Sequence, residues 1–315
     1  GATDLTKYPH VVAGKWLSIS GLETPTLVAS SYTGEGFEPV APGLGALRLH
    51  MPQVVDHTGQ VVDGNGTDAG SMKLMFAEPD FGTTNRLFWR YYFRLGTPYA
   101  RTPADRIEQM WTSVPSWADM AGKCGIGPSH HNTYGGVTGT SGGPNGWQMR
   151  CLWGDCEVNV GGPNEGGIRV GYHLTDFESP PQPAGYSYQF AASAWGQRGG
   201  HGGMLYAGRW YCIEGELALN TVNPAGNSWA PDGALRTWID GRLVFEKTGM
   251  VFRTLPIYAP AYNGSVLRPC RTLGVKELWA NWFHGGRTSN TVDRTSFIAG
   301  LAWGRSRIGQ MRMGS

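Results

Sequence analysis

A segment of alternating aromatic and basic residues carries the side chains in this sequence that are best suited to chemistry on an acidic ligand. Residues 87–95 read LFWRYYFRL, so in an extended strand Arg90, Tyr92 and Arg94 share one face. A guanidinium keeps its charge and matches a carboxylate with two parallel hydrogen bonds. We therefore expect this face to line a groove; the alternative is an exposed strand with solvated arginines.

Two carboxylates form a second chemically capable set, in the strand expected over 209–220. Glu214 and Glu216 lie on one strand face, ~7 Å apart along the strand, a spacing compatible with the acid and base of a glycoside hydrolase. Glucanases of the laminarinase type carry a third acid two or three residues further on, where this sequence has Leu217-Ala218-Leu219. We favour the structural alternative, in which both charges pair with arginines across a sheet.

The elements that must position these side chains are β-strands. The chain has 48 Gly and 20 Pro, and 40% of its residues are hydrophobic but only 16% charged. Coiled coils and long solvated helices need more Glu, Lys and Arg, whereas short strands joined by Gly and Pro turns suit this composition. Alternating polarity predicts strands at 45–51, 71–76, 87–95, 147–153, 168–174, 209–220, 234–240 and 276–284, and Asp240-Gly241 predicts a tight hairpin. We predict one all-β domain over residues 1–315, a β-sandwich or β-jelly roll of two antiparallel sheets.

Three segments interrupt this pattern. A helix is predicted at 102–111, with Thr102 as cap and Pro103 in the first helical position. Two glycine-rich stretches, 122–146 and 196–203, are predicted to be irregular, and the first carries two adjacent histidines. Such long loops are either functional or merely mobile.

Charge and hydropathy restrict the partners. The net charge is +2, which gives no electrostatic case for nucleic acid. No stretch reaches the ~20 apolar residues of a membrane span, and no signal peptide is visible. Because the sequence opens at Gly1 rather than Met, we expect a mature or trimmed form, in a secreted or periplasmic setting that the aromatic-rich, lysine-poor composition favours.

The five cysteines are an odd set without a Cys-x-x-Cys pair. Cys151 and Cys156 flank a tight turn, so a disulfide across it is geometrically plausible. Small buried thiols are the alternative.

Several segments occur in an order that resembles one enzyme family. They are IRVGYHL at 168–174, AGYSY at 184–188, GRWYCIEGELALN at 208–220, the Asp232-Gly233 turn with LRTWIDGRLVF at 235–245, and WFHGG at 282–286. In this order they resemble the concanavalin-A-like jelly-roll polysaccharide lyases, particularly the glucuronan-lyase-like group. The resemblance covers about residues 70–290 and leaves 1–70 unmatched.

The resemblance implies a concave substrate groove and β-elimination at a uronic acid unit. This reaction needs a group that neutralises the carboxylate, a base for the adjacent proton and an acid for the leaving oxygen. We assign the first task to Arg90, and the base and acid to His173 and Tyr188, with Tyr92 in reserve. His173 is expected in the same concave sheet as 87–95; a histidine there also serves as a hydrogen-bonded neighbour.

Further residues are expected to bind the sugar chain. They are Arg94, His130, His131, Arg150, Glu214, Glu216, Trp282 and His284. For Trp282, packing in the core is the alternative. A structural calcium is expected by the resemblance, with Asp232 as the first ligand to try, although an Asp-Gly turn also explains this residue. We expect no organic cofactor and a monomer.

These observations predict a secreted polysaccharide lyase acting on an anionic, uronic-acid-containing polysaccharide. Two alternatives stay open. One is a non-catalytic carbohydrate-binding domain, and the other is a glycoside hydrolase that uses Glu214 and Glu216.

Overall fold

The structure is a computed structural model, and it describes part of the chain. The described residues are 15–21, 26–51, 70–75, 85–96, 123–130, 147–148, 151–154, 169–175, 187–191, 205–223, 225, 228–250, 275, 277–283 and 293–311. Apart from a short 3-10 turn, η2 (Gly34–Gly36), the regular elements in these ranges are strands. No helix within them is long and apolar enough to cross a membrane.

One sheet has eight strands, and each pairs antiparallel with its neighbours. The strand order is β1-β4-β16-β6-β7-β9-β10, and β8 pairs with β6 and β9. The strands are β1 (Lys15–Gly21), β4 (Gly70–Met75), β16 (Glu277–Phe283), β6 (Lys123–His130), β7 (Trp147–Gln148), β8 (Cys151–Gly154), β9 (Arg169–Thr175) and β10 (Ser187–Ala191).

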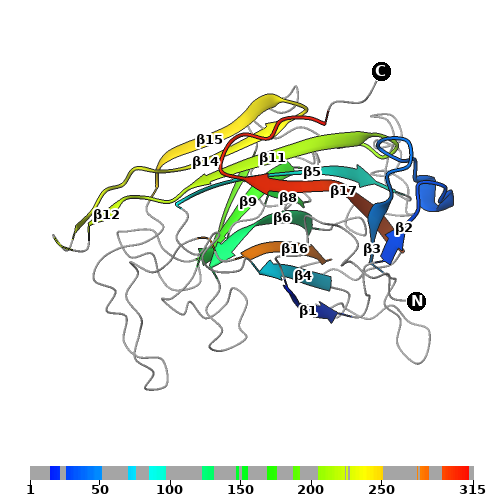
Figure 1. Cartoon of the computed structure of the whole chain (residues 1–315), viewed down its shortest axis with the longest axis horizontal. Coiled ribbons are helices and arrows are strands. Elements are labelled where there is room, and N and C mark those ends of the chain that lie inside the picture. The colour runs from blue at the N-terminus through cyan, green and yellow to red at the C-terminus, as the bar shows by residue number, and fades with distance from the viewer. Residues whose placement is uncertain are drawn as a thin grey trace, which may run out of the picture.

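The second sheet has seven antiparallel strands in the order β15-β14-β11-β5-β17-β3-β2. They are β15 (Arg242–Met250), β14 (Gly233–Ile239), β11 (Trp210–Ala218), β5 (Arg86–Leu95), β17 (Arg294–Gly304), β3 (Ala46–Met51) and β2 (Thr26–Val28). A separate ribbon of β12 (Val222–Asn223) and β13 (Ser228–Trp229) projects at one end of the molecule (Figure 1).

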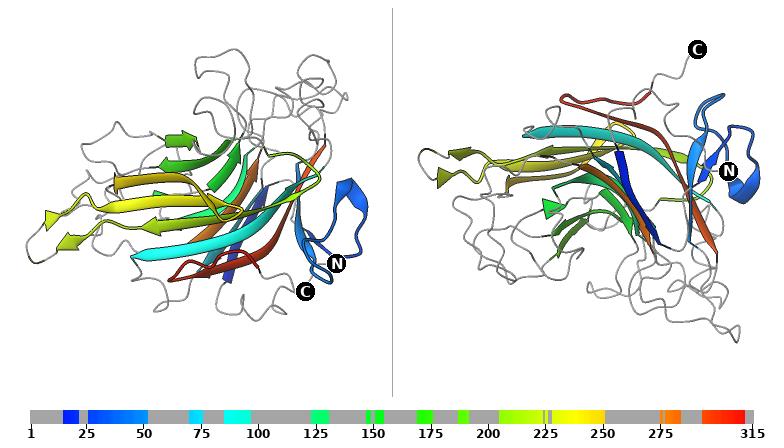
Figure 2. Two further views of the ribbon diagram at one scale, coloured as in Figure 1. Left: turned by 90° about the horizontal axis from the view of Figure 1, so that it is seen from above. Right: turned by 60° about the horizontal axis from the view of Figure 1, so that its bottom comes forward.

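The two sheets lie one over the other and form a β-sandwich, as predicted (Figure 1). Figure 2 shows the strands of one sheet crossing over those of the other. β5 supplies much of the core between them, because every second residue from Leu87 to Leu95 is fully buried. Among these, Trp89 donates a hydrogen bond from Nε1 to the carbonyl oxygen of Ile126 in β6, 2.8 Å away. This hydrogen bond connects β5 and β6, which lie in the middle of their sheets.

Gly215 makes room for this tryptophan. It is the cross-strand neighbour of Trp89, and a Cβ at this position would lie 2.1 Å from Cζ2 of the indole ring. Since real Cβ atoms do not approach so closely, an alanine here would force the ring to move within a densely packed core.

A second, smaller core lies on the far side of the seven-stranded sheet. Phe37, Val40, Tyr92, Cys212 and Phe297 pack there together with Ala46 and Ala299. Two chain segments close this core, namely the loop that follows β2 and the C-terminal segment that follows β17. The outer face of this sheet is therefore covered by the chain itself around Tyr92, Cys212 and Phe297.

All eight strand predictions coincide with observed strands, except that 147–153 is divided into β7 and β8. The Asp240-Gly241 hairpin is confirmed, because both residues have positive φ (50° and 81°) and connect the paired residues Ile239 and Arg242, as a two-residue primed turn requires. The prediction of an irregular stretch from 122 is wrong for its first part, which forms β6. Glycine and proline weaken the strand pattern of KCGIGPSH, but pairing with neighbouring strands on both sides outweighs this propensity. The helix predicted at 102–111 and the stretch 196–203 lie outside the described residues.

Candidate functional site

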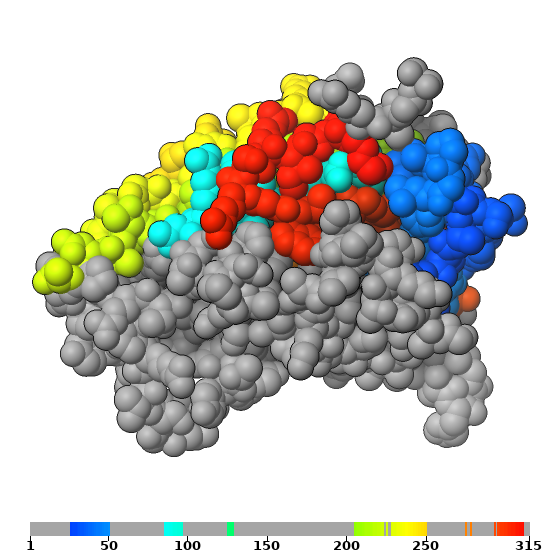
Figure 3. Space-filling model, viewed as in Figure 1, coloured from blue at the N-terminus to red at the C-terminus, as the bar shows by residue number. Residues whose placement is uncertain are grey.

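The polar face of β5 does not line an open groove. Arg90, Tyr92 and Arg94 point away from the sandwich core, but their exposed fractions are only 7%, 6% and 2%. The covering segments bury them. Figure 3 shows the C-terminal segment (red) on the surface over β5 (cyan), beside residues 26–50 (blue).

Each of these three side chains holds a covering segment. Arg94 donates from Nε and Nη2 to the carbonyl oxygen of Gly36, at 3.1 and 2.7 Å. Tyr92 accepts a hydrogen bond at its hydroxyl from the backbone N–H of Met311, at 2.8 Å. Arg90 donates from Nη1 to the carbonyl oxygen of Gly309, at a long 3.4 Å. Arg94 also forms an ion pair with Glu38, 3.3 Å away, so the observed contacts of this face are with the covering segments of the chain itself.

Glu214 also binds one of the covering segments, the one that follows β17. One carboxylate oxygen accepts hydrogen bonds from the backbone N–H groups of Ile308 (2.6 Å) and Gly309 (3.0 Å). The other accepts from Nε of Arg307, 3.0 Å away. The carboxylate is 97% buried, and both its oxygens are occupied by the C-terminal segment.

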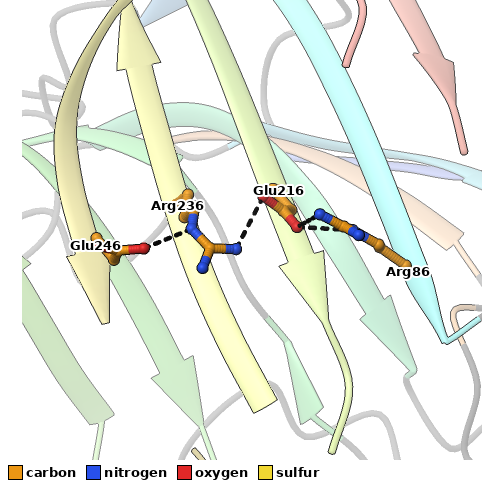
Figure 4. Close-up of polar contacts among 4 residues, drawn as sticks. All are labelled: Arg86, Glu216, Arg236 and Glu246. Carbon is orange, nitrogen blue, oxygen red and sulfur yellow. Dashed lines mark hydrogen bonds and ion pairs between the residues drawn. The ribbon is translucent and has the colours of Figure 1, made fainter. Parts of the chain in front are cut away.

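Glu216 belongs to a row of alternating charges across four strands, which Figure 4 shows. It accepts from Nε of Arg86 at 2.7 Å and from Nη1 of Arg236 at 3.2 Å, while Nε of Arg236 donates to Glu246 at 2.6 Å. The hydrogen bond to Glu246 is the main cause that raises the pKa of Arg236. This confirms the structural interpretation of Glu216 and leaves neither carboxylate free for hydrolysis.

Burial also makes this face unsuited to proton transfer near neutral pH. It raises the pKa of the Tyr92 hydroxyl, and it raises the pKa of the neighbouring Cys212 thiol to about 11. A catalytic acid or base works best when its pKa lies near the working pH. Both groups are therefore shifted away from the useful range.

The expectation that the polar residues of β5 and His173 share one sheet is wrong. β5 lies in the seven-stranded sheet, whereas His173 lies in β9 of the eight-stranded sheet. Alternation within a strand shows which residues share a face, but the sheet that a strand joins depends on distant pairing.

The outer face of the eight-stranded sheet can be identified from backbone register. Ile126 and Leu278 are buried, so their side of the sheet faces the core. Ile126 lies in one row with Ala280, Cys151, Tyr172 and Phe190. Since successive residues of a strand alternate between faces, the neighbouring row, which contains His173, belongs to the outer face.

Polar residues share this outer face with His173. Gln189 of β10 is the direct cross-strand partner of His173, and Gln148 of β7 pairs with Thr175. On the other side of β6, Lys73 pairs with Trp279, and Ser71 pairs with Asn281. By residue type the face combines an imidazole, amides, an ammonium group and an indole, the groups that bind sugar hydroxyls and carboxylates.

Local sequence patterns did not indicate four residues of this face, namely Gln189, Gln148, Lys73 and Asn281. A signal was present in ELWANWF (277–283), where Trp279 and Asn281 alternate with Leu278 and Ala280. This pattern could not identify outer-face residues, because the sequence does not show which face of the strand points toward the core.

Backbone register separates two of the predicted residues from His173. Tyr188 pairs with Leu174, and Trp282 pairs with Cys124, so both positions belong to rows with the parity of Ile126. Positions one residue apart in register belong to opposite faces, and the assignment of Tyr188 as the acid stays a prediction. His130 pairs with Trp147 and has the register parity of Ile126, so it also belongs to the core-facing rows.

The other predicted binding residues, His131, Arg150 and His284, lie outside the described residues, as does Cys156 of the predicted disulfide.

The Asp232 carboxylate binds a neighbouring part of the chain. Its two carboxylate oxygens accept hydrogen bonds from the backbone N–H (2.6 Å) and the hydroxyl (2.7 Å) of Thr221. In the described ranges, no three or more His, Cys, Asp or Glu side chains gather as metal ligands. Asp232 fixes the chain between β11 and β14, and the calcium stays a prediction without an assigned ligand.

Comparison with solved structures identifies this architecture. Alginate lyase vAL-1 from Chlorella virus superimposes with a TM-score of 0.55 and 11% identity, covering 92% of this chain and 93% of the other. The marine PL-14 alginate lyase from Aplysia kurodai gives 0.50 and 11%, with 92% and 90% covered. This chain has the jelly-roll fold of these lyases.

The endo-β-1,4-glucuronan lyase from the fungus Trichoderma reesei is also similar, with a TM-score of 0.48, 11% identity and 92% and 91% coverage. The fold assignment rests on the first two structures. No family model matches the sequence, and no curated protein matches it either.

Proposed function

We propose that this protein is a secreted or periplasmic polysaccharide lyase that cleaves an anionic, uronic-acid-containing polysaccharide by β-elimination. The observation that carries the proposal is the pairing of His173 with Gln189 on the outer face of the eight-stranded sheet. Two structures that support the fold are alginate lyases, and alginate is a polyuronate.

The roles follow from the chemistry of the residues on this face. His173 is the proposed base, because an imidazole titrates close to neutral pH and can take the proton adjacent to the carboxylate. The imidazolium that forms can then return this proton to the leaving glycosidic oxygen, so that one residue serves as base and acid. The amides of Gln189 and Gln148, which lie on two strands that pair with β9, are proposed to bind the carboxylate and so stabilise the negative charge that develops on it. β-Elimination involves no oxidant or reductant, so no organic cofactor is proposed.

The test is incubation with alginate, glucuronan and a neutral glucan, with ultraviolet absorbance and reducing ends followed in parallel. We expect both signals to rise on a polyuronate, because elimination leaves an unsaturated sugar at each new end. Reducing ends without absorbance would indicate hydrolysis. Saturable binding without any product would indicate a carbohydrate-binding domain.

The residue assignment is tested on the active substrate with His173→Gln. Loss of a general base lowers kcat by ~10²–10⁴-fold. His50→Gln is the matched control, because His50 lies in β3 of the other sheet, beside Asp293. We expect His50→Gln to keep wild-type turnover, and an equal loss in both variants would contradict the assignment.

A further inference from the structure

The C-terminal residues 305–311, named here the strap, lie flat on the outer face of the seven-stranded sheet (Figures 1 and 3). The strap leaves β17, and Arg307 reaches the β14–β15 hairpin. There Nη2 of Arg307 donates to the carbonyl oxygen of Gly241 at 3.1 Å, and its guanidinium stacks on Trp238 at 4.5 Å. The strap then returns over β5 to Met311, which packs against the small outer core.

One carboxylate binds the middle of the strap. As described above, Glu214 accepts two backbone N–H groups and the Arg307 guanidinium. Hydrogen bonds to a charged group contribute more to stability than hydrogen bonds between neutral groups. Glu214 is therefore the principal polar anchor of the strap.

The closed strap leaves another buried charge poorly satisfied. Arg90 is 93% buried, and its Nε has no hydrogen-bond partner among the described residues. Its contacts are the long bond to Gly309 and a Tyr92 ring 5.4 Å away. A buried charge without a matched partner is costly, and this cost is present only while the strap covers it.

The natural partner for Arg90 is already adjacent. In the pairing of β5 with β11, Arg90 lies directly opposite Glu214. Side chains in such positions share a face, with Cβ atoms ~4.5–5.5 Å apart, within reach of an ion pair. Glu214 is thus placed between two competing cations, Arg307 of the strap and Arg90 of the sheet.

We propose that the strap is a two-state latch in which Glu214 exchanges partners. In the closed state, which the structure shows, Glu214 binds the strap. In the open state Glu214 pairs with Arg90, and the strap lifts and exposes Tyr92 and Cys212. The latch does not depend on the proposed function.

Cys212 is a built-in probe of the open state. It is buried, its thiol is free, and its raised pKa keeps the closed state unreactive at mildly alkaline pH. We would label the native protein with a thiol reagent and quantify the peptide that contains Cys212 by mass spectrometry. Hydrogen exchange of the Ile308 and Gly309 amides would report the strap itself.

Two substitutions should act in opposite directions. Glu214→Gln weakens the hold on the strap, and we expect Cys212 labelling to accelerate at least tenfold. Arg90→Met removes the competing partner and the unsatisfied charge, so labelling and strap exchange should become slower than in the wild type. Glu246→Gln, at the exposed end of the neighbouring charge row, is the control and should match the wild type.

Thermal unfolding of each variant separates strap opening from general destabilisation. Faster labelling in both variants, in proportion to lost stability, would overturn the latch and leave only a structural contact. Unchanged labelling in both would overturn it as well.

Discussion

The outer faces of the two sheets carry different sets of polar residues. The face of the seven-stranded sheet carries the more conspicuous residues, with arginines, buried glutamates and a tyrosine, but its own loop and strap cover it and its charges are used to hold them. The face of the eight-stranded sheet carries histidine, glutamines, asparagine and lysine in register. A concentration of charged residues on a strand therefore does not by itself identify a reactive surface, because these residues can be buried and paired with other groups of the chain.

The largest stability effect on the covered face is expected from Glu216→Ala. This substitution leaves Arg86 and Arg236 without their shared carboxylate at a site that is 98% buried. Removal of one partner of a buried pair costs ~3–5 kcal/mol, and the partial exposure of both arginines reduces this to about 2–3 kcal/mol. Chemical denaturation measures the loss, and turnover of the folded variant should be unchanged. A parallel loss of turnover at full stability would place Glu216 in the reaction.

A smaller effect, with a defined pH dependence, is expected at Glu35. The hydrogen bond from Arg48 is the main cause that lowers the pKa of Glu35, and Tyr32 also donates to this carboxylate. A lowered pKa in the folded state means that Glu35 contributes stability above its unfolded pKa of ~4.3 and that this contribution is lost as the pH falls through the folded pKa. We expect Glu35→Gln to lower stability at pH 7 and to flatten the acid limb of a stability-against-pH curve.

Thr26→Ser serves as the control for Glu35→Gln, because Thr26 is exposed on the edge strand β2. Its curve should follow the wild type at every pH. An acid limb that is equally steep in the wild type and Glu35→Gln would show that Glu35 does not contribute to it.

The smallest effect is expected from Arg209→Ala. Arg209 donates to Asp240 at 2.8 Å, but the guanidinium is exposed, and exposed ion pairs contribute ~0.2–1 kcal/mol. The melting temperature should fall by no more than a few degrees, with the difference vanishing at high salt. A larger loss would show that Asp240 depends on Arg209 to hold the hairpin turn, where it also binds the backbone N–H of Cys212.

The strand pattern and the sandwich could be predicted because alternation is local. Leu87 to Leu95 show period two in the sequence and are the core of the structure. β6 could not be found in this way, since its glycines and proline carry no strand signal and its place is set by β16, β7 and β8.

The candidate site was predicted less well for a physical reason. Arg90 and His173 have residue types suited to elimination, but their sheets are set by pairing over long sequence distances. The strap that covers Arg90 comes from the far end of the chain, 219 residues away at Gly309. No local pattern around Arg90 indicates that it is covered.

The location of the reaction is decided by kcat/KM of two variants on the polyuronate that the wild type cleaves. We expect His173→Gln, on the outer face of the eight-stranded sheet, to lower kcat/KM at least a hundredfold. Arg90→Met, beneath the strap, should keep kcat/KM near the wild-type value. Loss in Arg90→Met with retention in His173→Gln, both variants being folded, would contradict the account and return the reaction to the seven-stranded sheet.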